Sequence, residues 1–210
     1  MSYKNEFKNC LDGLFESLCE VSDWMYENPE LGFQEFKTSK YLVDYIQKNS
    51  KSVNYPSHGL ETAFDITFGE EGPLTVICVE YDALPEIGHA CGHNIIATAS
   101  IGAGLGLKDI ASKLGIRVKL LGTPAEEGGG GKIILINEGA FEDASCSMMI
   151  HPGYEDVVNP TFTTIEQYTV EYFGKDAHAA GAPDQGINAL DAQIQLFVNA
   201  STYRQQMVQS

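Results

Sequence analysis

The sequence predicts an α/β fold in which a mostly parallel central sheet is flanked by helices. Three apolar-rich runs, at 74–79, 116–121 and 145–150, have the length and composition of strands, and the first is continuously apolar. The first of them, LTVICV, is typical of a strand that is covered on both faces. Helix-like stretches separate the three runs, and strands that alternate with helices indicate a parallel sheet.

The first part of the chain predicts two packing helices and one further strand. Apolar side chains recur at three- and four-residue steps over 3–27, and Asn28-Pro29 ends this helix. A second helix is predicted over 34–47. Residues 62–68 alternate between polar and apolar, as in a half-buried strand.

Two helices are predicted between the apolar runs. The first, over 93–114, is rich in glycine and alanine, which suggests that it packs closely against the sheet. The second is predicted over 131–137.

The pattern changes beyond Pro160. Residues 166–173 alternate as in an antiparallel strand, and 187–207 is helical. We therefore expect one domain over 1–163 and the opening of a second over 164–210. The second domain is incomplete, because one strand and one helix cannot bury their own apolar faces.

Composition narrows the classes of partner and compartment. The 210-residue chain is 43% hydrophobic, which is ordinary for a globular protein. Its formal charge of -16 repels phosphate backbones, which argues against nucleic acid, and attracts cations, although an acidic surface also serves solubility alone. No signal core or membrane-length apolar run is present. With five irregularly spaced cysteines, we expect free thiols in the cytoplasm and no membrane partner.

Side chains that bind metals follow each of the three buried runs. In chain order they are Cys91, His93, Glu126, Glu127 and His151. In open α/β sheets, ligands bind beyond the carboxyl ends of the strands. Thiolate, imidazole and carboxylate groups that converge from separate loops favour a divalent metal such as zinc.

Structural explanations of these residues remain open. Cys91 and His93 could be a small core thiol and a buried imidazole, and the adjacent Glu126 and Glu127 could form a solvated helix start. In the metal hypothesis, one glutamate binds the ion and the other takes a proton from the water that the ion holds. The glycine run does not fit a phosphate-binding loop, because Glu126 occupies the position of the first glycine and Ile133 that of Ser or Thr.

Five segments, in the same order, resemble motifs of the M20 family of metallopeptidases and amidohydrolases. They are ENPELGFQEFKTS (27–39), EYDALPEIGHACGHN (80–94), GTPAEEGGGGK (122–132), MIHP (149–152) and GKDAHAAGAPDQGINAL (174–190). The second motif and the long glycine run resemble the family's Xaa-Arg/Lys dipeptidase branch more than its auxin-conjugate hydrolases. The chain resembles roughly the N-terminal half of a family member.

The resemblance implies an M20-type catalytic domain over 1–163, without the segment that returns to complete its sheet. It also implies that 164–210 opens an α+β lid domain, through which the full-length protein forms a homodimer. Two divalent ions (zinc, manganese or cobalt) are implied, with Cys91 as the bridging ligand and with terminal ligands at His93, Glu127 and His151.

Three further residues receive roles from the resemblance. Glu126 matches the family's general base, Asp82 matches a carboxylate that orients a ligand, and His178 matches a histidine that polarises the scissile carbonyl in the partner subunit's site. The family carries one more ligand histidine near its C-terminus. Of the two histidines without a role so far, His89 is interpreted as structural or as a support for the ligands, and only His58, which precedes the predicted ligands, is left.

The implied function is hydrolysis of the amide bond of a dipeptide or N-acyl amino acid by a metal-activated water. The acidic balance and the branch favour a basic residue on the C-terminal side of the substrate. An aminoacylase-like or aminobenzoyl-glutamate hydrolase-like activity is an alternative. A second alternative is a truncated, inactive M20-like fragment that at most binds metal or acts through protein interaction.

Overall fold

A computed structural model describes residues 2–158, 160–161, 166 and 168–207. The chain divides into two compact units, Met1–Asp156 and Val157–Ser210. The domain boundary predicted between residues 163 and 164 lies outside the described residues and stays a prediction.

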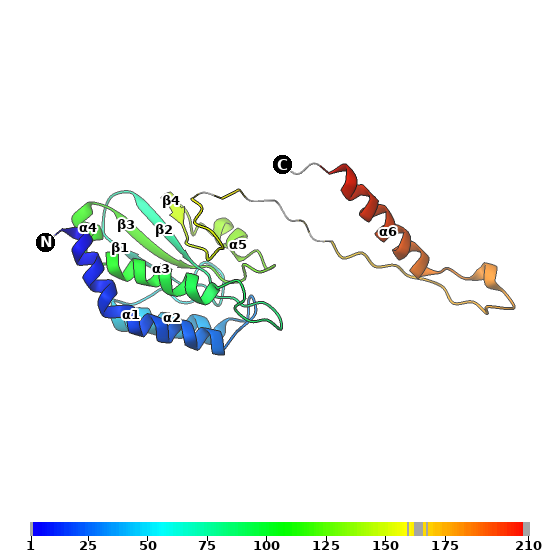
Figure 1. Cartoon of the computed structure of the whole chain (residues 1–210), viewed down its shortest axis with the longest axis horizontal. Coiled ribbons are helices and arrows are strands. Elements are labelled where there is room, and N and C mark those ends of the chain that lie inside the picture. The colour runs from blue at the N-terminus through cyan, green and yellow to red at the C-terminus, as the bar shows by residue number, and fades with distance from the viewer. Residues whose placement is uncertain (1, 159, 162–165, 167, 208–210) are drawn as a thin grey trace. The chain divides into compact units, whose positions relative to one another are not determined.

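Unit 1 is built on a four-stranded sheet with the order β1-β3-β2-β4 (Figure 1). Its strands are β1 (Asp65–Phe68), β2 (Leu74–Val79), β3 (Arg117–Gly122) and β4 (Ala144–Met148). β2 pairs in parallel with both β3 and β4, whereas β1 pairs antiparallel with β3. The predicted α/β class with a mostly parallel sheet is confirmed.

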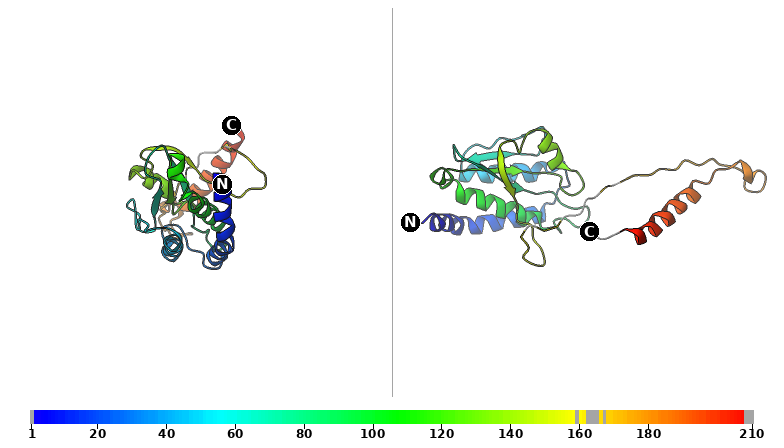
Figure 2. Two further views of the ribbon diagram at one scale, coloured as in Figure 1. Left: turned by 90° about the vertical axis from the view of Figure 1, so that its left-hand side faces the viewer. Right: turned by 90° about the horizontal axis from the view of Figure 1, so that it is seen from above.

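Helices cover both faces of this sheet. On one face lie α1 (Tyr3–Glu27), α2 (Phe36–Asn49) and α3 (His93–Leu107). On the other face, Leu135 of α5 (Gly131–Asn137) packs with Val76 and Leu121. Successive residues of one strand pack on opposite faces of the sheet, because side chains alternate along a strand. The same layers can be followed in the two views of Figure 2.

α3 packs closely on the sheet because its glycines leave room. A Cβ on Gly104 would lie 2.5 Å from the Cγ of Leu120 in β3, much closer than two carbon atoms approach. The close packing predicted from the glycine and alanine content is therefore confirmed.

Several predicted elements have shifted bounds in the structure, and for two of them the structure shows the reason. The helix predicted over 93–114 is interrupted by a turn at 108–110, which buries Ile110, and its second part is the short α4 (Ala111–Leu114). The strand predicted over 62–68 begins only at Asp65. The carbonyl of Ala63 accepts a hydrogen bond from the N–H of Ser57 in a turn instead of from a neighbouring strand.

Among its described residues, unit 2 contains one long helix, α6 (Ala189–Tyr203), and two short 3-10 helices, η1 (Pro183–Gln185) and η2 (Arg204–Gln206). The strand predicted over 166–173 is not formed by its described residues, and Gln167 lies outside them. Lys175, two residues after this segment, forms an isolated bridge with Ile187. The physical reason is that an alternating segment without a partner strand has no ladder to join.

Within the described residues, no helix is both long enough and apolar enough to cross a bilayer.

Candidate metal centre

Three parallel neighbours bring the candidate ligands to one edge of the sheet. Glu80 and Asp82 follow β2, Glu126 and Glu127 follow β3, and His151 follows β4. β2 lies between β3 and β4 and runs parallel to both, so their carboxyl ends meet (Figure 1). The topology therefore gathers segments that are far apart in the sequence, at the edge where ligands bind in such folds.

His93 is the first residue of α3, and its side chain is only 1% exposed. Its Nδ1 lies 2.8 Å from the backbone carbonyl of Asp82 and 3.1 Å from the Oδ1 of the same residue. Both of these atoms are acceptors, so Nδ1 carries the proton and Nε2 of the neutral ring carries a lone pair. Burial lowers the pKa of His93, but the bond and charge of Asp82, with Glu80 and Glu127, raise it overall.

Among the described residues, two groups of side chains offer ligand atoms to a cation, and His93 belongs to both. The first group is Glu80, His93 and His151, and the second is His93, Glu126 and Glu127; within each, the ligand atoms lie within 4.8 Å of one another. His93 Nε2 lies 3.4 Å from Glu80 Oε2. It also lies 3.8 Å from one carboxylate oxygen of Glu126 and 3.8 Å from one of Glu127. Because Nε2 has one lone pair, both groups converge on one cation position beside His93.

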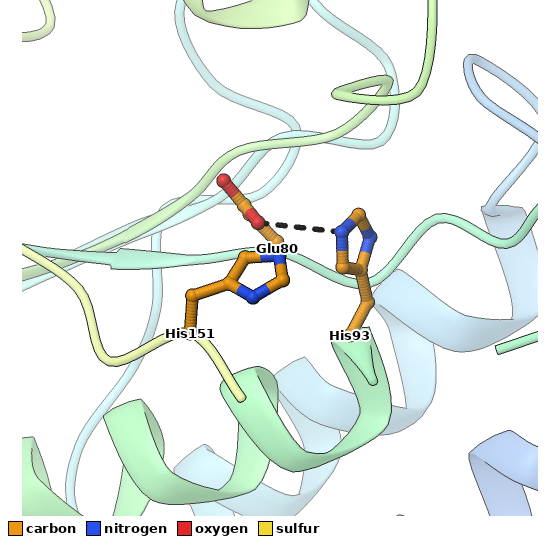
Figure 3. A group of neighbouring side chains, drawn as sticks. All are labelled: Glu80, His93 and His151. Atoms are coloured by element: carbon orange, nitrogen blue, oxygen red, sulfur yellow. Dashed lines mark ion pairs between the residues drawn. The ribbon is translucent and has the colours of Figure 1, made fainter. Parts of the chain in front are cut away.

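His151 follows β4 and is exposed. Its Nδ1 donates to the carbonyl of Pro152 at 2.8 Å, which leaves Nε2 as the free acceptor, as in His93. The two imidazole rings meet edge to face, with centroids 6.1 Å apart. Figure 3 shows both rings beside the carboxylate of Glu80.

Asp82 joins two of the candidate ligands. Its Oδ1 lies beside His93 Nδ1, and its Oδ2 accepts the backbone N–H of Glu127 at 2.8 Å. Burial raises the pKa of Asp82, but the hydrogen bonds from His93 and from the Glu127 backbone outweigh burial and lower it. Asp82 is thus an ionised carboxylate within the site, and its predicted orienting role stays a prediction.

The loop that carries Glu126 and Glu127 is held by a buried carboxylate from another segment. Glu35 is fully buried, and its Oε1 accepts the N–H of Ala125 at 2.8 Å. Ala125 has a φ of 55°, a left-handed conformation that costs energy for a residue with a Cβ. At the other end of the loop, a Cβ on Gly131 would lie 1.9 Å from the carbonyl oxygen of Pro124, so only glycine fits.

The two glutamates differ in exposure. The side chain of Glu126 is 41% exposed and that of Glu127 is 20% exposed. Partial burial, followed by the nearby charges of Glu80 and Glu127, raises the pKa of Glu126. A carboxylate with a raised pKa at an accessible position has the properties of a proton acceptor and donor.

Cys91 belongs to neither group of ligand atoms among the described residues. It is half-buried, and its thiol donates a hydrogen bond to the carboxylate of Glu127. That bond, with burial and the charges of three carboxylates, raises the pKa of the thiol to about 11. The structure therefore places Glu127 and His151 beside His93, each in a different group of ligand atoms, and places Cys91 against Glu127. The roles of these four predicted ligands stay predictions.

His178 lies in unit 2, where it is exposed. Its Nδ1 accepts the backbone N–H groups of Ala180 at 3.2 Å and Gly181 at 2.9 Å. The proton of the neutral ring is therefore on Nε2, the reverse of His93 and His151. Its predicted place in a partner's site stays a prediction.

Glu80, which the structure places against His93, was not among the residues predicted from the sequence. The available signal was its position: it is the first residue after the buried strand β2 and lies two residues before Asp82. A side-chain period of two puts both carboxylates on the same side of an extended chain.

The residues fit a divalent cation. Within the described part of the chain, the buried atoms His93 Nε2 and Glu80 Oε2 have no hydrogen-bond partner. Buried polar atoms without partners are costly, and one cation would satisfy both. Imidazole and carboxylate ligands with a thiol nearby are the set that a borderline-soft ion such as zinc prefers.

Comparisons with known proteins indicate the family to which the chain belongs. No protein-family model matches the chain. The Xaa-Arg dipeptidase of Mus musculus is 38% identical over 94% of this chain and 49% of its own length. One of the subunits of the p-aminobenzoyl-glutamate hydrolase of Escherichia coli is 30% identical over 82% of this chain and 40% of its own length.

A solved structure adds the class of protein. A dinuclear metal-binding peptidase of the M20 family from Bacillus subtilis is 25% identical, with a TM-score of 0.58, over 65% of this chain and 42% of its own. This chain belongs to the M20 family. A Staphylococcus aureus structure of the same fold is 20% identical, with a TM-score of 0.69, over 98% of this chain and 58% of its own. The chain spans about half the length of the curated M20 relatives that it matches.

Proposed function

We propose that this chain carries the metal-binding part of a metal-dependent amidohydrolase that cleaves a dipeptide or an N-acyl amino acid. One observation carries the proposal: the buried Nε2 of His93 has no hydrogen-bond partner among the described residues and faces carboxylate oxygens of Glu80, Glu126 and Glu127. Its Nδ1 is committed to Asp82, so the lone pair of Nε2 is available to a cation.

His93, Glu127, His151 and Cys91 would hold the cation. Asp82 fixes the ring of His93 and the backbone of Glu127 at the same time, which keeps both ligands in place. The thiol of Cys91 would release its proton to solvent before it binds the cation, because the thiolate is the metal ligand. Two ions per site and zinc as the metal follow from the M20 resemblance and from the mixture of soft and hard ligands.

Glu126 would handle the protons of the reaction. A bound divalent cation supplies Lewis acidity toward the amide carbonyl and lowers the pKa of a water molecule. The exposed carboxylate of Glu126 accepts the proton of the attacking water and returns it to the nitrogen of the leaving amine. This return matters because a neutral amine leaves far more readily than an amide anion.

His178 would act on the carbonyl oxygen. Its Nδ1 accepts two backbone N–H groups, so its exposed ring presents Nε2–H as a donor. A donor is what a carbonyl that develops negative charge requires. In the dimer that we propose, this donor reaches the site of the partner subunit.

We propose a substrate with a basic residue on its C-terminal side. A net charge of -16 attracts cationic substrates, and one relative is named for Xaa-Arg dipeptides. Other relatives are named for aminobenzoyl-glutamate and acetylcysteine, so N-acyl amino acids are the second class to test. All five cysteines are free thiols, which suits the reducing cytoplasm.

Metal analysis and a hydrolysis assay on the same variants test the proposal. After reconstitution with zinc, manganese or cobalt, Cys91→Ala and Glu127→Ala should lose bound metal. Glu126→Gln should keep the metal and lose hydrolysis. The substrates are basic dipeptides, N-acyl amino acids and aminobenzoyl-glutamate.

Each other outcome has a distinct meaning. Equal metal content in the wild type and all three variants would refute the ligand assignment. Cleavage of acyl amino acids alone would support an aminoacylase-like enzyme. Metal binding without cleavage of any substrate would support a protein that binds metal and does not catalyse.

A further inference from the structure

Glu80 is a buried carboxylate that the proposed mechanism does not use. It directly follows β2, and its side chain is 1% exposed. One oxygen, Oε1, accepts a hydrogen bond from Nζ of Lys132 in α5. The other, Oε2, points toward His93 and has no hydrogen-bond partner within the described residues (Figure 3).

We propose that Glu80 is a metal ligand, whose Oε2 binds the same cation as His93 Nε2 while Lys132 holds its Oε1. This inference rests on the proposed function, because it adds a ligand to that site. It accounts for both orphaned atoms at once, since a single cation between them replaces the two missing hydrogen bonds.

The distance between the two atoms supports a shared ion. Two ligands that are each about 2.0 to 2.1 Å from a tetrahedral ion lie about 3.3 to 3.4 Å apart. His93 Nε2 and Glu80 Oε2 are 3.4 Å apart, which is long for a hydrogen bond between nitrogen and oxygen. His151 completes the group, with its ligand atom within 4.8 Å of the other two.

Lys132 explains how Glu80 keeps its position. A buried carboxylate is costly unless it is paired, and Lys132 supplies one positive charge from a side chain that is 31% exposed. Because this ion pair occupies only Oε1, it fixes the carboxylate with Oε2 directed at His93. A ligand that is held in this way loses little freedom when the ion binds.

Zinc affinity of the metal-free chain tests the proposal, with a chromophoric chelator as competitor and without any assay of activity. Glu80→Gln should raise the zinc dissociation constant by about 100-fold or more, because a direct ligand matters at least as much as the groups that support ligands. Lys132→Gln should change it by less than about 10-fold, because Oε2 remains. Glu6→Gln, which removes the same charge from the exposed pair with Lys113, is the matched control and should leave it unchanged.

Circular dichroism of each variant establishes that it is folded. If Glu80→Gln does not fold, Glu80→Asp retains the charge and withdraws the carboxylate by one methylene group, and it should weaken zinc binding by about 10-fold or more. Unchanged zinc affinity in a folded Glu80 variant would overturn the proposal. Equal losses in Glu80→Gln and Lys132→Gln would also overturn it, because the pair would then act structurally. If the wild type binds no zinc, the proposed function itself fails.

Discussion

Replacement of Glu35 by alanine should destabilise unit 1 and loosen the loop that carries Glu126. Glu35 is fully buried, with Ala125 N–H bonded to one of its oxygens at 2.8 Å and the hydroxyl of Thr62 bonded to the other at 3.0 Å. Each buried donor left without a partner costs about 1 to 3 kcal/mol, so the loss of both amounts to roughly 2 to 6 kcal/mol. That is a large part of a typical stability of about 5 to 15 kcal/mol.

Urea denaturation of the metal-free chain measures this loss. Trp24 is the only tryptophan of the chain, and it stacks on Tyr41 at 4.1 Å between ring centroids, so its fluorescence reports the packing of α1 against α2. Glu35→Gln is the matched variant. It keeps a carbonyl oxygen for Ala125, and the hydroxyl of Thr62 can turn to accept from the new amide, so we expect a loss of less than about 1.5 kcal/mol.

Zinc binding by the same variants tests the link to the site. Because Ala125 directly precedes Glu126, Glu35→Ala should also weaken zinc binding when the folded fraction is held equal, whereas Glu35→Gln should not. Two results would refute the reasoning. One is an alanine variant within about 0.5 kcal/mol of the wild type, and the other is a glutamine variant as damaged as the alanine variant.

Three further predictions concern pH, packing and thiol reactivity. Burial raises the pKa of Glu35 in the folded chain above its ordinary value of 4.5. The stability that Glu35 contributes is therefore fully present below pH 4.5 and is lost as the pH rises through the higher folded-state pKa. The stability of the wild type relative to Glu35→Gln should therefore fall in urea titrations as the pH is raised above 4.5, and a constant difference would contradict the sign. Gly104→Ala should lower the free energy of unfolding by about 1 to 3 kcal/mol, because its Cβ meets Leu120 of the sheet. Gly13→Ala, whose Cβ has nothing within 4 Å, should raise that free energy by about 0.5 to 1 kcal/mol. Urea midpoints that move in the same direction in both variants would contradict the packing. Burial raises the pKa of the Cys78 thiol to about 11, so iodoacetamide should label exposed Cys19 in the folded protein and reach Cys78 only on unfolding, as mass spectrometry of the peptides would report.

Local patterns were enough to predict most of the fold. The bounds of α1 at 3–27 and of β2 at 74–79 are those that the sequence indicates, because each has a strong period or a continuous apolar run and a clear end signal. The strand predicted over 166–173 is absent among its described residues. An alternating pattern indicates only that a segment can form a half-buried strand, and a strand also needs a neighbouring strand with which to pair.

The candidate site divides in the same way. His93, Glu127 and His151 could be named from the sequence because each follows a strand that a local apolar run reveals. Glu80 was not singled out, since its one sequence signal, a position directly after a strand, is equally typical of a carboxylate in a solvated turn. Its importance depends on Lys132 and His93, which meet it only in the folded chain.

The sequence by itself determined which chemical groups this protein brings to the ends of its strands, and in what order, because strand and helix signals are local. Only the tertiary structure decided how those groups are used. The proton of His93 is on Nδ1 because Asp82 lies beside it, and its buried Nε2 faces carboxylates because the parallel strands β2 and β3 end at the same edge of the sheet. Tautomers and distances of this kind depend on contacts between distant segments, which no local pattern encodes.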